Sequence, residues 1–115
     1  MKYLIKDIVG ENCITLEDGQ RLFGQISSEL KKGNKVELDF NGVIIFASPF
    51  FNSGIGQLLE TISFKELTEL LRILNLEPSG HEVLDRVISN SIEYYSNPAY
   101  RESLNKIIED PSRDR

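Results

Sequence analysis

The segment from residue 35 to residue 47 most strongly restricts the fold of this chain. Residues 35–40 alternate between polar and apolar side chains, residues 43–47 are continuously apolar, and Asn41-Gly42 separates the two runs. The Asn-Gly pair is compatible with a tight hairpin turn or with a bend inside one long buried strand. A strand that is apolar on both faces belongs in a sheet that is covered by helices. The segment therefore predicts a layered α/β domain.

Ser48-Pro49 follows this segment directly and predicts the start of a helix. Serine is a favoured N-cap residue, and proline fits the first helical position because its missing N–H costs nothing there. The apolar stripe of this helix consists of Phe51, Ile55, Leu58, Leu59 and Ile62. The opposite face carries Phe50, Ser53, Gln57 and Glu60. We expect these four residues to be exposed. Gly54 and Gly56 each cost the helix about 1 kcal/mol relative to alanine, which indicates close packing or the approach of a partner.

The N-terminal third of the chain predicts a strand region followed by a helix. Residues 3–9 are rich in strand formers and stop at Gly10, which is typical of a strand or a strand pair. Thr15 lies three residues before Asp18, the spacing of a capping box. Apolar residues then recur at helical spacing, so we expect a helix over about 16–32.

The C-terminal half contains two more capping boxes, which begin at Ser63 and at Ser79 and predict two helices. Residues 70–76 fit a helix and a strand equally well. Residues 97–108 predict a last helix after Asn97-Pro98.

The order of elements is therefore β-α-β-α-β-α, which predicts an α/β fold with helices packed on a small mixed sheet. We expect a single domain over residues 1–110 and a frayed tail over residues 111–115.

Composition excludes several classes of function. The 115 residues include 13 Lys+Arg and 18 Asp+Glu, a net charge of −5. A pI near 4.9 disfavours a nucleic-acid partner, since phosphate binding needs a basic surface. The single cysteine and the absence of a long apolar run indicate a cytoplasmic chain with no membrane partner.

A search for catalytic or metal-binding patterns finds no constellation of base, nucleophile and donor. His81 and Cys13 each lack neighbours in sequence that would make a metal site or an activated thiol. Gly54-Ile55-Gly56 lacks the third glycine of a nucleotide-binding fingerprint and lies inside a helix pattern. Asp39, at the end of a predicted strand, favours a structural role over a catalytic one. We therefore expect no cofactor, no metal and no enzymatic activity.

Residues 36–56 resemble the centre of a STAS domain. The closer resemblance is to the STAS-like domains of unknown function, in which a strand ending in an acidic-apolar-x-Gly-Val segment is followed by a Ser-x-x-Phe helix start. Anti-sigma factor antagonists are more distant relatives. They carry Asp-Ser-Ser-Gly-Leu-Gly after the same strand, and a partner kinase phosphorylates the second serine. The resemblance implies a STAS-like fold, with a strand within residues 70–76.

The resemblance leaves two candidate phospho-acceptors, Ser53 and Ser48. Without gaps, Ser48 matches the first serine of the family motif, Pro49 takes the place of the phosphorylated one, and Ala47 replaces the acidic residue. With a shift of three residues, Asn52-Ser53-Gly54-Ile55-Gly56 matches Ser-Ser-Gly-Leu-Gly. The ungapped alignment makes Ser48 a helix cap whose oxygen is occupied.

The sequence thus predicts a non-enzymatic cytoplasmic regulatory module that docks on a partner protein. The resemblance points to a kinase-like, ATP-binding switch protein as that partner. We expect the docking surface on the helix that starts at Ser48, with Phe50, Ser53 and Gln57 facing outward. Two alternatives are a homodimeric structural module without a phosphoswitch and an enzyme of unknown type.

Overall fold

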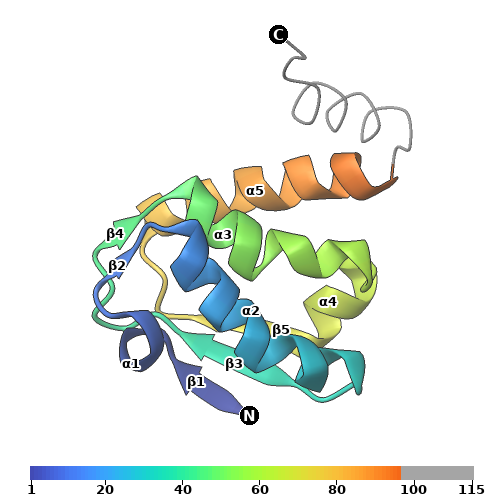
Figure 1. The fold of residues 1–115 in the computed structure, drawn as a ribbon, viewed down its shortest axis with the longest axis horizontal. Helices are drawn as coiled ribbons and strands as arrows, with labels where there is room; N and C mark the ends of the chain where they lie inside the picture. Colours follow the sequence, from blue (N-terminus) through green and yellow to red (C-terminus); the bar gives the residue numbers. More distant parts are fainter. Residues whose placement is uncertain (97–115) are drawn as a thin grey trace, which may run out of the picture.

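The computed structural model describes residues 1–96, which form two small parallel sheets and a layer of helices (Figure 1). In chain order the elements are β1 (Lys2–Leu4), α1 (Ile5–Val9), β2 (Asn12–Cys13), α2 (Leu16–Lys31), β3 (Val36–Asp39), β4 (Ile45–Phe46), α3 (Ser48–Gly54), the 3₁₀ helix η1 (Gly56–Glu60), α4 (Phe64–Leu70), β5 (Leu71–Leu74) and α5 (Pro78–Ser96). The expected last helix at 97–108 and the tail at 111–115 lie outside the described residues. The expected α/β class with helices packed on a sheet is confirmed.

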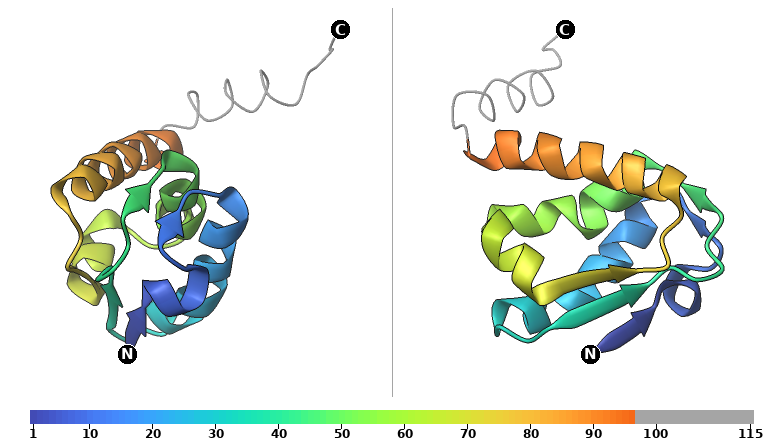
Figure 2. Two further views of the ribbon diagram at one scale, coloured as in Figure 1. Left: turned by 90° about the vertical axis from the view of Figure 1, so that its left-hand side faces the viewer. Right: turned by 180° about the vertical axis from the view of Figure 1, so that it is seen from behind.

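The larger sheet has the strand order β1-β3-β5, and both pairings are parallel, so it is a parallel rather than a mixed sheet. Leu38 of β3 lies between Tyr3 and Ile73 on the inner face, where β3 is buried. Helices α2, α3 and α5 lie on that side (Figures 1 and 2). On the outer face Glu37 lies between Lys2 and Arg72, which are both exposed, so this part of the face is open to solvent. The assignment of residues 70–76 to a strand is confirmed by β5.

Two of the expected helix starts are confirmed by their capping hydrogen bonds. The Thr15 hydroxyl oxygen accepts from the Asp18 backbone N–H at 3.0 Å, at the start of α2. The Ser63 hydroxyl oxygen accepts from the Glu66 N–H at 3.1 Å, at the start of α4. Helix α5 instead begins at Pro78, so Ser79 lies inside its first turn and is not its cap.

The expectation of a strand over residues 3–9 is only partly correct. The strand β1 ends at Leu4, and the helix α1 follows. Ile5, Ile8 and Val9 then share one helical face that packs on the core, with Ile5 completely buried. Tertiary burial of this face overrides the preference of β-branched residues for strands.

Neither reading of Asn41-Gly42 is correct. The Val43 N–H donates to the Phe40 carbonyl at 3.0 Å across a turn in which Gly42 has a φ of +88°. Beyond the turn, β4 leaves the larger sheet and pairs in parallel with β2. Outside the larger sheet, only Val43 of the expected buried run is buried. Ile44 and Ile45 are exposed.

Candidate functional site

The start of α3 lies one residue earlier than the sequence predicts. Ala47 is the N-cap, Ser48 is the first helical residue, and no side chain makes a capping hydrogen bond there. The reason is the pairing with β2, because the Ala47 N–H donates to the Cys13 carbonyl at 2.9 Å and holds Ala47 extended. Ser48 is half-buried, and within residues 1–96 its hydroxyl makes no hydrogen bond. The expectation that Ser48 is a cap with an occupied oxygen is therefore wrong.

Phe50 and Ser53, expected on the outward face of this helix, are buried. Phe50 is completely inaccessible, and Ser53 is 7% exposed. The Ser53 hydroxyl donates its proton toward the Leu16 carbonyl of α2 at 2.8 Å, with the Pro49 carbonyl also within 3.1 Å. Ser53 is therefore a contact between two helices, and a phosphate on it has no space in this packing.

Glycine allows α2 and α3 to approach so closely. A Cβ atom added at Gly19 of α2 would lie under 3.0 Å from both the Ser53 Oγ and the Phe50 carbonyl oxygen. On the other side, a Cβ at Gly56 would lie 2.5 Å from the Ser91 Oγ of α5. The close packing expected for Gly54 and Gly56 is confirmed, since Gly54 faces Gly19 in the same way. The segment α3–η1 is thus enclosed between α2 and α5.

The expected outward face also fails because the helix does not continue. Helix α3 ends at Gly54, Ile55 has φ −122° and ψ −48°, and η1 follows with about 3.0 residues per turn. Side chains beyond Gly54 therefore leave the 3.6-residue pattern on which the prediction depended. Gln57 is half-buried, and Glu60 alone of the four is exposed.

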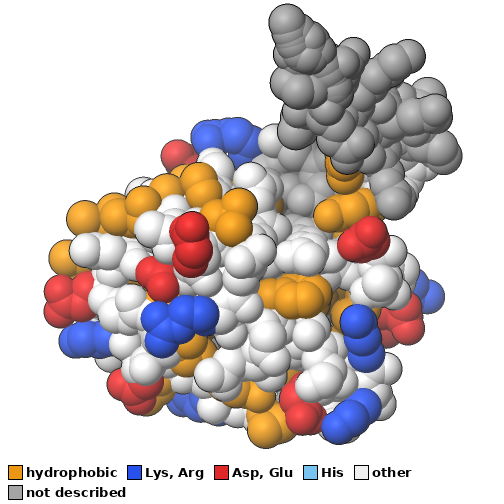
Figure 3. Space-filling view, viewed as in Figure 1, with side chains coloured by type: hydrophobic (Ala, Val, Ile, Leu, Met, Phe, Trp, Pro, Cys, Tyr) orange, Lys and Arg blue, Asp and Glu red, His pale blue; other side chains and the backbone are white. Residues whose placement is uncertain are grey.

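Exposed aliphatic side chains surround the start of α3 in place of the expected residues. Ile14, Leu16 and Ile45 are 40%, 48% and 46% exposed, and Pro49 is exposed beside them. They are neighbours because Ile45 pairs with Asn12, while the Leu16 carbonyl contacts α3 through Ser53. Figure 3 shows hydrophobic side chains gathered over this end of the molecule, at the upper left. We call these four residues the apolar patch.

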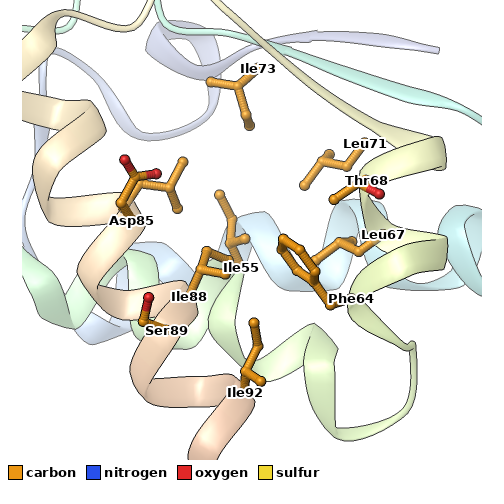
Figure 4. A pocket seen from close by; sticks show the side chains of 11 residues that line it. Ile55, Phe64, Leu67, Thr68, Leu71, Ile73, Asp85, Ile88, Ser89 and Ile92 are labelled. Atoms are coloured by element: carbon orange, nitrogen blue, oxygen red, sulfur yellow. The ribbon is translucent and has the colours of Figure 1, made fainter.

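A second apolar surface lies between α4, β5 and α5. It is a groove with a volume of about 450 Å³ (Figure 4). Its walls are mainly apolar side chains, among them Phe64, Leu67, Leu71, Ile73, Ile88 and Ile92. Phe64 is the first residue of α4 and is 47% exposed. Sequence reasoning missed this groove, although the apolar residues of the two predicted helices on either side of it were visible.

The surroundings of Cys13, Asp39 and His81 do not form a catalytic or metal-binding arrangement within the described residues. Burial, and then the charge of Asp18, raise the pKa of the Cys13 thiol to about 12, so it is protonated and inert. Hydrogen bonds from the Asn75 side chain and the Asn41 N–H, both 2.9 Å, lower the pKa of Asp39, with help from Lys2 at 3.6 Å. Asp39 thereby ties β1, β3 and the end of β5 together, as a structural role requires. His81 is exposed in the first turns of α5.

Among residues 1–96, no group of three or more His, Cys, Asp or Glu side chains could hold a metal ion. No helix in the same range has the length and apolar character needed to cross a membrane.

Comparison with known proteins agrees with the fold described above. No curated protein and no solved structure is significantly similar to the chain. A family model, described as a STAS-like domain of unknown function, matches residues 18–81, which is more than half of the chain. The match begins inside the first turn of α2, includes the central strand β3, the whole α3–η1 segment and β5, and ends inside the first turns of α5. The chain belongs to the family of STAS-like domains of unknown function.

Proposed function

We propose that the chain is a non-enzymatic, cytoplasmic regulatory module that docks on a partner protein through the apolar patch. The observation that carries the proposal is the exposure of Ile14, Leu16 and Ile45 around the first residue of α3. Membership of a STAS-like family, whose fold is not typically enzymatic, supports an interaction role. The surface is the one expected from sequence, the start of this helix, but its contact residues are different.

The patch can supply part of the free energy of a specific contact, and polar contacts around it must supply the rest. Full burial of one Leu or Ile side chain contributes about 1.5–3 kcal/mol. Since each of the three is already about half covered, a partner that covers them gains roughly 3 kcal/mol before the costs of association. Glu17 is exposed next to Leu16 and forms no ion pair within the described residues, which favours a partner with a basic rim around an apolar contact.

Ser48 is the phospho-acceptor that this proposal retains. It is the first residue of α3, next to the patch residue Pro49, and its hydroxyl makes no hydrogen bond within residues 1–96, whereas Ser53 is buried against α2. A phosphate on Ser48 would place about −1.5 to −2 charges beside the apolar contact and weaken docking without entering the core. The kinase-like, ATP-binding partner that the family resemblance implies would supply such a reaction.

The test is capture of partners from the source cells on the tagged full chain, with and without ATP. The matched control is Leu4→Ser, because Leu4 is 45% exposed and ends β1 on another face, whereas Ile45 is 46% exposed in β4. We expect one protein to be retained by the wild type and by Leu4→Ser and to be lost with Ile45→Ser. With that protein purified, calorimetry should give at least a tenfold weaker affinity for Ile45→Ser. Equal affinity of all three chains would refute the patch.

The same variants distinguish docking on a partner protein from the homodimeric alternative. Light scattering over a range of concentrations should report a monomer for the wild type. A dimer that dissociates with Ile45→Ser would show that the patch binds a second copy of the chain rather than a partner protein.

A further inference from the structure

The outer edge of β5 is a feature that the proposed function does not use. Within the described residues, β5 pairs with β3 on one side only, which leaves its other edge free. No residue of β5 is fully buried, whereas three of the four residues of β3 are. A free edge presents a row of backbone N–H and C=O groups that can pair with another strand.

The free edge of β5 borders the groove. Leu71 and Ile73 of β5 line the groove, and α5 runs back across from β5 on the far side (Figures 2 and 4). Arg72 points to the opposite face of the sheet, where its guanidinium lies 3.9 Å from the Glu37 carboxylate. The charged residue of β5 therefore leaves the groove side of the edge unobstructed.

The groove has dimensions that suit a short extended segment. Four strand residues rise about 13 Å at roughly 3.3 Å each, so β5 can pair with a segment of four or five residues. Alternate side chains of such a segment point the same way, and a volume of about 450 Å³ lies beside the edge to receive them. An edge strand next to an apolar groove is the arrangement used in recognition by strand addition.

Charge indicates the composition of the segment. Asp85 of α5 is the one charged residue among those lining the groove. It is exposed, and no cation pairs with it within residues 1–96. A carboxylate at the margin of an apolar groove favours a ligand with a positive charge at the matching place.

We propose that the groove binds an extended segment of a partner protein, which adds to β5 as a further strand. The segment places apolar side chains at alternate positions in the groove and a lysine or arginine next to Asp85. None of these contacts uses the apolar patch, so this site and the proposed function stand or fall separately.

The test is selection of peptides from a random twelve-residue display library on the immobilised full chain. Enriched peptides should alternate apolar residues and carry a lysine or arginine. Phe64→Ala should weaken their affinity at least tenfold. The control Leu4→Ala should leave it unchanged, because Leu4 is 45% exposed against 47% for Phe64 and ends β1, away from both the groove and the apolar patch. Selection on Asp85→Lys should replace the basic residue by an acidic one.

Two measurements on the best peptide test strand addition itself. Backbone N-methylation should weaken binding at least tenfold at alternate positions only, and hydrogen exchange of residues 71–74 should slow at least tenfold on binding. Binding that ignores N-methylation, or that leaves β5 exchange unchanged, would overturn strand addition. Failure to enrich any peptide that distinguishes Phe64→Ala from Leu4→Ala would overturn the site. A dimer lost on Phe64→Ala would overturn the choice of a partner protein in favour of a second copy.

Discussion

Replacement of Gly19 by alanine tests the contact between α2 and α3 that decides where the functional surface lies. The helix α2 contains two glycines, Gly19 and Gly24. An added Cβ at Gly24 has no heavy atom within 4 Å, whereas one at Gly19 meets the Ser53 hydroxyl and the Phe50 carbonyl oxygen. The same substitution in the same helix therefore isolates the effect of the helix contact.

The two substitutions should change stability in opposite directions. Gly24→Ala should stabilise the domain by about 0.5–1 kcal/mol, because alanine loses less conformational entropy in a helix. Gly19→Ala receives the same benefit but forces the helices apart, which costs about 1–3 kcal/mol. It also displaces the Ser53 hydroxyl from its carbonyl partners, and a buried hydroxyl without a partner costs about 1–3 kcal/mol more. The two variants should differ by roughly 2–6 kcal/mol.

Urea unfolding followed by circular dichroism measures this difference, and Tm should move by about 4 °C per kcal/mol for a domain of this size. The double variant Gly19→Ala/Ser53→Ala is the control for the hydroxyl. It should regain only part of the loss, because the Phe50 carbonyl still obstructs the added methyl group. If Gly19→Ala proves as stable as Gly24→Ala, α2 and α3 are not in contact and the burial of Ser53 is wrong.

Three further predictions concern titratable or modifiable side chains. In urea unfolding, Ser53→Asp should destabilise the domain by about 3 kcal/mol or more, because an unpaired carboxylate would face carbonyl oxygens. Ser48→Asp, at the first residue of α3, should change the free energy of unfolding by less than about 1 kcal/mol. A thiol reagent at pH 8 should label Cys13 only after unfolding. The pKa of Cys13 is raised from 9.0 to about 12 in the folded protein, so the thiol ionises first in the unfolded chain. The free energy of unfolding should therefore fall as pH rises above 9.0 in the wild type but not in Cys13→Ala. The pKa of Asp39 is lowered chiefly by the hydrogen bond from Asn75, so the ionised carboxylate stabilises the fold above its ordinary pKa of 3.8. This stabilisation is lost as pH falls through the lower pKa of the folded protein. In urea titrations Asp39→Asn should be less stable than the wild type at pH 7, and the difference should shrink below pH 3.8.

Local sequence signals predicted the elements whose causes are local. Thr15 and Ser63 cap the helices α2 and α4 through hydrogen bonds that span three residues, and such bonds depend on sequence spacing alone. The family motif likewise lies within one continuous segment, and it correctly placed a strand in the ambiguous residues 70–76. The signals did not predict α1, β2 or the separation of β4 from β3, because these depend on tertiary packing.

The site residues were misplaced because their surroundings depend on distant parts of the chain. The helical pattern assigned Phe50 and Ser53 to a polar side, on the assumption that a helix has one buried face. The segment is instead enclosed by α2 and α5, whose contacts lie more than 30 residues away on either side. Gly19 marks the close approach of α3, but Gly24 in the same helix has open space beside it, so the sequence alone does not tell the two glycines apart.

The enclosure of α3 limits where regulation of this domain can act. A modification on its inner surface must separate two helices, so it costs the fold a large part of the 5–15 kcal/mol that stabilises a typical domain. A modification at Ser48 changes only the exposed end, because the side chains around it are already half open to solvent. A reversible switch needs a change in partner affinity that leaves the fold intact, and the start of α3 meets that condition where Ser53 does not. A change in the groove along β5 would also alter partner affinity without disturbing the fold, since neither Phe64 nor Asp85 is buried.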